Sequence, residues 1–416
     1  GLSAAAIEAL NQGAKLGGFA HDTGEGAISP YHKKHGGDLI WELGTGYFGC
    51  RNHDGTFSPE KFAERSRIEQ VKMIEIKLSQ GAKPGKGGVL PKEKITPEIA
   101  ETRDVPMDAD CVSPASHSAF TTPREMVQFW QQLRELSGGK PVGFKLCVGQ
   151  PWQFMAIVKA MIEADNYPDF IVVDGAEGGT GAAPVEFMDN VGMPLLDGFL
   201  LVHNTLVGAG VRDKIKIGVS GKIISAFDIA RMLALGADWC NSARGFMFAV
   251  GCIQSRACHT NKCPTGVATQ DPYRQRALHI PDKAQRVYNF HKNTLKSLAA
   301  IVGAVGLKHP KDLQAYHIAR RLENGQIKLL SKFYYFTEPG VLLNLSARSD
   351  VFNQMWVMAN PDSFLANNEA LIAYNHDVRH AHDHNEKRFN EGNYPERIDS
   401  FDETANSYYT YDDDPS

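Results

Sequence analysis

Three cysteines crowd into one short stretch of the chain and could together bind a soft metal centre. Cys252, Cys258 and Cys263 are separated by five and four residues, and Pro264 follows directly. Thiolates in one loop can converge on iron–sulfur clusters or zinc. Three thiolates suit a cuboidal cluster that lacks one iron, whereas zinc normally needs a fourth ligand, and His259 is badly placed to supply it. Three buried structural thiols are the other alternative.

Two further loops could bind a phosphate group. Gly218-Val-Ser-Gly221 and Ser242-Ala-Arg-Gly245 each follow an apolar stretch. In barrel enzymes the loops after the last two strands commonly form a phosphate site, because backbone N–H groups there face the anion. Ordinary turns are the alternative. The residues predicted to hold a cofactor phosphate are Gly218, Ser220, Gly221, Arg244 and Gly245.

A third loop is richer in glycine and could accept a flat ligand. The run Asp174-Gly-Ala-Glu-Gly-Gly-Thr-Gly181 continues an apolar segment at 170–173. Glycine permits positive φ and lets the backbone come close to a ring system. The residues of this loop predicted to contact the cofactor are Glu177, Gly178, Gly179 and Thr180.

Two charged side chains are the candidates for direct chemistry. Lys145 lies in the apolar run 143–146, where an ammonium group is costly to bury unless it meets an anion or a reduced flavin, or reaches solvent. Glu25 lies between glycines in Asp22-Thr-Gly-Glu-Gly26 and could take or give a proton. The loop Lys83–Gly88 could bind an anion or form a solvated turn. We predict catalytic roles for Lys145 and Glu25.

Alternating strands and helices are expected to position these loops. Short apolar stretches are followed by small residues and then by amphipathic segments, as in parallel βα units. This pattern predicts an α/β fold, either a (β/α)8 TIM barrel or a doubly wound sheet. No Gly-x-Gly-x-x-Gly follows an early strand, which disfavours a dinucleotide-binding sheet. The predicted strands span 73–78, 143–146, 170–173, 215–219 and 237–241, and the predicted helices span 123–136, 151–164 and 226–235.

Past residue 275 the pattern turns helical, with predicted helices at 284–305 and 310–322. The predicted domains are a barrel with the cysteine loop (1–275), a C-terminal helical extension packed on it (276–384) and an extended or disordered polar tail (385–416). The aromatic run 333–336 indicates a buried strand or a packing patch. His203 lies in an apolar segment and is expected to pack in the core. Four histidines between 376 and 384 favour a solvated polar helix over a metal site.

Composition excludes several classes of protein. The 416 residues are 43% hydrophobic and 22% charged, which is typical of a globular enzyme. A net charge of −4 offers no basic field for nucleic acid. Seven cysteines, three of them in one loop, do not fit a disulfide framework. No export or membrane segment is evident in the sequence. We therefore expect a cytoplasmic protein. The chain begins with Gly1 and not with Met, which leaves open a signal or membrane association upstream.

The motifs, taken in order, resemble the FMN-binding glutamate synthase family, that is, the synthase domain of glutamate synthase in its stand-alone form. The resemblance runs from Gly1 to about Leu313, roughly three quarters of the chain. Its anchors are 22–26, 81–91, 112–117, 144–146, 174–184, the cysteine loop through Gln270, and 287–289.

The resemblance implies FMN at the carboxyl ends of the barrel strands and a [3Fe–4S] cluster on the three cysteines. In that family the reduced flavin delivers hydride to 2-iminoglutarate, formed from 2-oxoglutarate and ammonia, and the product is L-glutamate. By matching motifs, Lys145 would lie at the flavin and substrate, and Glu25 at the loop where ammonia arrives. The first barrel strand would precede Gly1.

The sequence also departs from the family pattern on the substrate side. Pro114-Ala-Ser-His-Ser-Ala119 replaces Pro-Pro-Pro-His-His-Asp, Val219-Ser-Gly221 replaces Asp-Gly-Gly, and Gly85-Lys-Gly-Gly88 replaces Gly-Glu-Gly-Gly. Two alternatives follow: the flavin subunit of an amine-transforming relative such as a methylglutamate-synthase-like enzyme, and a non-catalytic electron-transfer subunit. The sequence holds no amidotransferase or nicotinamide-binding region. The expected partners are therefore a ferredoxin or reductase subunit, an ammonia-supplying subunit and further copies of the chain.

Overall fold

The computed structural model describes residues 1–179, 183–344 and 351–375. The chain forms two units, 1–365 and 366–416, and within the second unit residues 368–375 are helical. Thr180, the histidines between 376 and 384 and the predicted tail from 385 onward lie outside the described residues. The domain boundaries drawn at residues 275 and 384 stay predictions.

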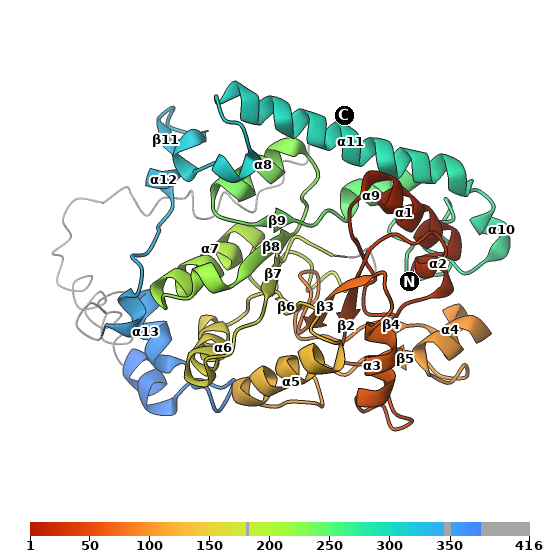
Figure 1. Cartoon of the computed structure of the whole chain (residues 1–416), viewed down its shortest axis with the longest axis horizontal. Helices are drawn as coiled ribbons and strands as arrows, with labels where there is room; N and C mark the ends of the chain where they lie inside the picture. The colour runs from red at the N-terminus through yellow and green to blue at the C-terminus, as the bar shows by residue number, and fades with distance from the viewer. Residues whose placement is uncertain (180–182, 345–350, 376–416) are drawn as a thin grey trace, which may run out of the picture. The chain divides into compact units, whose positions relative to one another are not determined.

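Seven parallel strands form one sheet in the first unit, and their order in the sheet is their order in the sequence. Sequential parallel order is that of a (β/α)8 barrel, in which each crossover leads to the neighbouring strand. The sheet curls into a half-barrel with helices on its outside (Figure 1). The predicted α/β barrel class is confirmed, and seven of the described strands form the barrel sheet. The strands are β1 (His21–Asp22), β2 (Leu39–Leu43), β3 (Val71–Lys77), β6 (Val142–Leu146), β7 (Phe170–Asp174), β8 (Lys216–Ser220) and β9 (Trp239–Cys240).

The helices that cover the sheet carry clear start signals. Thr122 Oγ1 accepts a hydrogen bond from the backbone N–H of Glu125, and the Glu125 carboxylate accepts one from the backbone N–H of Thr122. Ser225 and Asp228 repeat this box. The predicted helices 123–136 and 151–164 therefore appear with those bounds, and 226–235 ends one residue earlier. The helices are α1 (Ala4–Gly17), α2 (Pro30–Lys33), α3 (Pro59–Ser66), α4 (Pro97–Arg103), α5 (Pro123–Leu136), α6 (Pro151–Ala164), α7 (Leu195–Gly208), α8 (Ala226–Ala234), α9 (Arg244–Val250), α10 (Pro272–Gln275), α11 (Ile280–Ala304), α12 (Leu330–Phe333) and α13 (Val351–Met358).

The two faces of the sheet differ in chemistry. Trp41 stacks on Phe62 of α3, and Phe144 stacks on Trp130 of α5, so these strand residues face the helices. Successive side chains of a strand point to opposite faces. Neighbours such as Glu42 and Lys145 therefore face the inside of the half-barrel, which is where a barrel enzyme can use them.

The C-terminal part of the first unit differs from its prediction in one segment. The long helix predicted at 284–305 is present as α11, which runs beside α1 (Figure 1). The helix predicted at 310–322 is wrong, because two single 3-10 turns lead into β10 (Ala319–Arg321), which pairs antiparallel with β11 (Ile327–Leu329). Gly325, at φ +81°, closes the turn between these strands. A second short hairpin pairs β4 (Val89–Leu90) with β5 (Cys111–Val112).

The aromatic run 333–336 is not a strand. The helix α12 ends at Phe333, and the side chains of Tyr334 and Phe336 pack against the main core, as the alternative of a packing patch predicted. His203 packs in the core as predicted: its ring lies 5.7 Å from that of Phe199, and burial lowers the pKa of His203 to about 4. None of the described helices combines the length and apolarity needed to cross a bilayer.

Candidate active site

Five charged side chains meet on the inner face of the half-barrel, and we call them the charge cluster. In the parallel pairing of the strands, Glu42 lies opposite Glu75 and Lys77 lies opposite Lys145. Asp22, at the end of β1, completes the group. Every member comes from a strand, so the register of the sheet and not a loop fixes their spacing.

Lys145 is surrounded by carboxyl groups of its own barrel. Its Nζ forms an ion pair with Glu42 and lies 3.7 Å from Oε1 of Glu75. Burial disfavours the ammonium form, but the charges of Glu42, Glu75 and Asp22 outweigh it and raise the pKa of Lys145 well above its ordinary value. The structure thus favours the ammonium form of Lys145, and Glu42 is an anion that meets it.

Glu25 lies at the edge of the charge cluster and pairs with its second lysine. Lys77 Nζ donates to Glu25 Oε2 at 3.0 Å and lies 3.3 Å from Glu42 Oε1. Ser113 Oγ donates to the other Glu25 oxygen at 3.3 Å. Burial alone would raise the pKa of Glu25, but Lys77 lowers it below the ordinary range. Glu25 is thus an ionised carboxylate on the wall of a small cavity that Lys77 and the backbone of 85–88 also line.

The carboxyl groups of the charge cluster differ sharply in acidity. Burial favours the neutral form of Glu42, but Lys145 and Lys77 overcome it and lower the pKa of Glu42 to about 2. Burial and the charge of Glu42 raise the pKa of Asp22 to about 6. Burial, with the neighbouring charge of Asp22, raises the pKa of Glu75 well above its ordinary value. The pKa values of carboxyl groups in one cluster are therefore shifted in opposite directions, downward for Glu42 and upward for Glu75.

The glycine loops after β3 and β7 interlock. Asp174 accepts a hydrogen bond from the backbone N–H of Gly81 at 2.7 Å. A Cβ on Gly81 would lie 1.7 Å from the carbonyl oxygen of Gly175, and one on Gly179, at φ +140°, would lie 1.9 Å from the Cβ of Ala82. Both positions require glycine, because a side chain would separate the two loops.

The other residues predicted to contact the cofactor ring and phosphate have structural partners. Glu177 accepts a hydrogen bond from the backbone N–H of Leu195 at 2.8 Å, which caps α7. A Cβ on Gly178 would lie 3.2 Å from the Cα of Gly221. Ser220 Oγ donates to Asp174, so the loops after β7 and β8 contact each other.

The loop after β9 lies beside the loop after β8. Ser242 Oγ donates to the carbonyl of Ile223 at 2.7 Å, and Arg244 begins α9. A Cβ on Gly245 would lie 2.5 Å from the ring of Phe290, and one on Gly218 would lie 2.4 Å from the ring of Trp239. Gly218 and Gly245 therefore leave the space that the rings of Trp239 and Phe290 occupy.

The cysteine loop packs against the small core that α1, α9 and α11 share. Cys263 is buried there, and backbone N–H groups of Ala268, Thr265 and Val267 donate to its sulfur. Burial would raise the pKa of Cys263, but these hydrogen bonds lower it. Burial and the neighbouring thiols raise the pKa of Cys258. The cysteine loop thus brings the thiols of Cys252 and Cys263 close enough to Cys258 to raise its pKa.

A buried lysine fastens the cysteine loop. Lys94 Nζ donates to the carbonyl of Cys258 at 3.0 Å and to that of Ala268 at 3.5 Å. Lys94 is only 2% exposed, and its Nζ also donates to the carbonyl of Gly1 at 3.1 Å. Lys94 therefore joins the middle of the cysteine motif to the segment that follows Cys263 and to the start of the chain.

The family described as "Conserved region in glutamate synthase" matches residues 1–308. This chain belongs to the glutamate synthase family. The glutamate synthase large subunit-like protein YerD of Bacillus subtilis is 42% identical over 327 residues, which are 78% of this chain and 62% of that protein. The archaeal glutamate synthase (NADPH) of Archaeoglobus fulgidus is 32% identical over 333 residues, 79% of this chain and 62% of that protein. The chain thus spans 62% of the length of these relatives.

A solved flavocytochrome b2 with benzoylformate is also similar in structure, with a TM-score of 0.44 and 11% identity over 74% of this chain and 63% of that one. This likeness is too weak to support an argument about function.

For this member of the glutamate synthase family, sequence reasoning found Lys145 and Glu25 but missed their partners. Glu42, Glu75 and Lys77 were not among the predicted site residues. A signal for two of them was present in β3, where Glu75 and Lys77 alternate with Ile74 and Ile76. Glu42 is the single charged residue of the apolar run 39–43, the same signal that pointed to Lys145 in 143–146.

Proposed function

We propose that this chain is the synthase part of a glutamate-synthase-like oxidoreductase, which binds FMN and a [3Fe–4S] cluster and forms L-glutamate from 2-oxoglutarate and ammonia. Membership of the family over residues 1–308 supports the reaction class. The observation that carries the proposal is the buried pair Lys77 and Lys145 at the carboxyl ends of β3 and β6. In barrel enzymes the chemistry is at this end of the strands.

The residues at the mouth of the half-barrel fit a flavin. FMN, when bound, supplies two-electron hydride chemistry at its ring. Two ammonium groups suit the negative charge of a reduced flavin ring. The wall formed by 85–88 needs small residues, since a Cβ on Gly88 would lie 2.0 Å from Glu25 Oε1.

The predicted cofactor contacts divide between ring and phosphate. Lys145 and the loop 177–180 would hold the ring, and the loops 218–221 and 244–245 would hold the phosphate. The contacts between 178 and 221 and between 223 and 242 support one continuous site. In this chain the backbone, more than side-chain charge, would bind the phosphate, apart from Arg244.

The cysteine loop fits an iron–sulfur cluster better than a single zinc ion. Zinc–sulfur bonds of about 2.3 Å in a tetrahedron place sulfurs about 3.8 Å apart. Among the described residues, the group of three potential ligands that all lie within 4.8 Å of one another is Asp22, Glu42 and Glu75, so at least one pair of the three sulfurs is farther apart than 4.8 Å. Backbone N–H groups around Cys263 suit a cluster thiolate, and such hydrogen bonds tune its potential. A [3Fe–4S] cluster, when bound, relays single electrons.

Lys145 is the proposed proton donor. Addition of hydride to the carbon of an imine requires a proton at the nitrogen, and the Nζ of Lys145 carries one. Glu42 holds this ammonium group at a fixed position, and Lys77 and Glu25 form the adjacent charged wall. The interlocked glycine loops would limit access of water to that wall.

Electrons and ammonia are proposed to come from other proteins. A ferredoxin or a reductase subunit would reduce the cluster, and an ammonia-supplying subunit or free ammonium would provide nitrogen. A homo-oligomer and a cytoplasmic location belong to the same proposal.

A turnover assay tests this function. The full chain is reconstituted with FMN, iron and sulfide and supplied with 2-oxoglutarate, ammonium and an artificial one-electron donor. We expect glutamate to form, and Lys145→Met to lower kcat about 10²-fold, the usual contribution of a general acid. Lys72→Met is the matched control, because Lys72 is an exposed lysine on the same strand as Lys77. Reduction and reoxidation of the flavin without glutamate would favour the electron-transfer alternative.

A further inference from the structure

A carboxyl group with no hydrogen-bond donor lies beside Lys145. Glu75 is completely buried, and neither of its oxygens has a donor. Its neighbour across the strand pairing is Glu42, and carboxyl oxygens of Glu42, Glu75 and Asp22 lie within 4.8 Å of one another. Ionised carboxylates this close repel strongly where water is excluded. The ionised form of Glu75 is therefore hard to reconcile with its position.

The lysines compensate only part of the negative charge. Glu42 contacts both Lys145 and Lys77, whereas Glu75 has Lys145 alone, at 3.7 Å. Lys77 is shared with Glu25 outside the charge cluster. The groups that face this interior are Asp22 from β1, Glu42 from β2, Glu75 and Lys77 from β3, Lys145 from β6 and Asp174 from β7. Four acids face two ammonium groups, so further positive charge is needed to balance them.

A proton supplies that charge more readily than a metal ion. The ammonium group of Lys145 already faces the oxygens of Glu42 and Glu75. A metal ion bound to these oxygens would therefore have to displace the ammonium group. A proton on Glu75 removes one negative charge and turns one of its oxygens from an unpaired acceptor into a donor toward Glu42. Both problems, the repulsion and the missing donor, disappear together.

We propose that the carboxyl group of Glu75 stores the proton that restores Lys145 after each catalytic cycle. This inference rests on the proposed function, in which the electron pair arrives as hydride from the reduced flavin. The Nζ–H bond of Lys145 breaks as the N–H bond of the product amine forms. The O–H bond of Glu75 then breaks as a new Nζ–H bond forms on Lys145, and Glu75 regains a proton from water by way of the half-buried Asp22.

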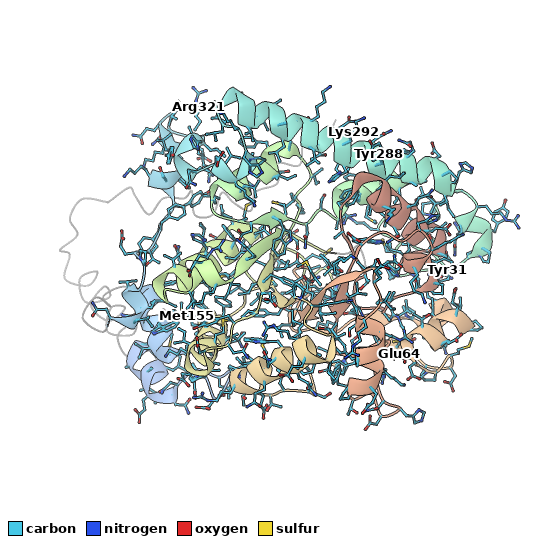
Figure 2. All side chains as sticks on the ribbon, viewed as in Figure 1. Tyr31, Glu64, Met155, Tyr288, Lys292 and Arg321 are labelled. Carbon is cyan, nitrogen blue, oxygen red and sulfur yellow. The ribbon has the colours of Figure 1, made fainter. Side chains whose placement is uncertain are left out.

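Glu75 thus acts through Lys145 and does not itself touch the substrate. Glu75→Gln keeps the shape and neutrality of the protonated acid but has no proton to give. Glu75→Asp keeps a carboxyl group on a shorter side chain. Glu64→Gln is the matched control, because Glu64 is exposed on α3 (Figure 2).

The first measurement needs no catalysis. Infrared spectra at neutral pH are expected to contain the C=O band of a protonated carboxyl group, which Glu75→Gln removes and Glu64→Gln retains. Urea unfolding gives a second readout. Above about pH 4.5 the unfolded chain ionises Glu75 while the folded chain does not. The unfolding constant of the wild type should therefore rise about tenfold per pH unit relative to Glu75→Gln.

The second measurement is the rate of glutamate formation against pH. Glu75→Gln is expected to lower steady-state kcat at least about tenfold with KM unchanged, while a first turnover that starts from charged Lys145 keeps its rate. Glu75→Asp should restore part of kcat. This division between first and later turnovers is not expected of a residue whose role is only structural.

The outcomes separate the inference from the proposed function. A carboxyl band that is absent, or that survives in Glu75→Gln, overturns the stored proton. Unchanged steady-state turnover in Glu75→Gln overturns its delivery to Lys145. A band that Glu75→Gln removes, in a wild type that forms no glutamate, supports the stored proton while it refutes the proposed function.

Discussion

The substitution Lys145→Met tests how strongly the charge cluster depends on its central cation. Methionine has a similar length, so the change removes the charge and little packing. Glu42 is then a buried carboxylate with Lys77 as its remaining partner, 3.3 Å away. Removing one partner of a buried ion pair usually costs about 3–5 kcal/mol. Because Lys77 remains, we expect the free energy of unfolding to fall by about 3 kcal/mol, the lower end of this range.

The assay is urea unfolding of the chain followed by circular dichroism, with Lys145→Met, Glu42→Gln and the double variant in one cycle. Lys145→Met/Glu42→Gln removes both charges, so its stability should lie within about 1 kcal/mol of the wild type, which gives a large coupling energy. The loss in Lys145→Met should also shrink at low pH. There, protonation of Glu42, whose pKa is no longer depressed by Lys145, removes the unpaired charge.

Two results would refute this reasoning. One is a loss below about 1 kcal/mol in Lys145→Met, which is the level of an exposed ion pair. The other is additivity of the two single variants, which would mean that Lys145 and Glu42 do not stabilise each other.

Three further predictions concern the scaffold. Gly81→Ala should separate the loops after β3 and β7, since its Cβ would lie 1.7 Å from the carbonyl oxygen of Gly175, and we expect faster proteolysis of both loops. Ser225→Ala removes the cap of α8 and should lower the free energy of unfolding by about 1 kcal/mol, measured by urea unfolding. Acid should destabilise the fold through its histidines. Burial lowers the pKa of five described histidines, so the unfolded chain binds their protons first, and stability should fall as pH drops from about 6.5 to about 4 in thermal melts. The histidines are His21, His32, His117, His203 and His291.

Local sequence signals predicted most of the fold, because most strands and helices of the first unit form where the apolar patterns and capping residues indicate them. The strands 143–146 and 170–173 and the helices 123–136 and 151–164 have strong periodicity and proline or capping residues at their starts. The segment 310–322 was misread, because its apolar spacing allows a helix while a turn at Gly325 favours a hairpin. Propensity alone could not decide between these two outcomes.

The sequence pointed to two members of the candidate site and not to the arrangement around them. Lys145 was predicted from the cost of burying a charge and Glu25 from its flanking glycines, and their roles stay predictions. What the sequence could not provide is the pairing register that sets Glu42 opposite Glu75 and Lys77 opposite Lys145. The glycines 218 and 245 illustrate the same limit, because the rings that need their space come from distant parts of the chain.

The kinds of side chain in the interior of the half-barrel indicate where chemistry takes place. Beside β7 and β9 the interior is apolar, with the rings of Phe170 and Trp239 5.7 Å apart, as is usual in barrels of this type. Beside β1 to β6 the charge cluster occupies the equivalent positions. Replacing buried ion pairs by apolar side chains of similar volume is often neutral or stabilising, so folding does not require this polar half. We therefore assign the charges a function, and the ammonium group of Lys145 beside the buried carboxyl group of Glu75 is the arrangement that the proposed proton transfer requires.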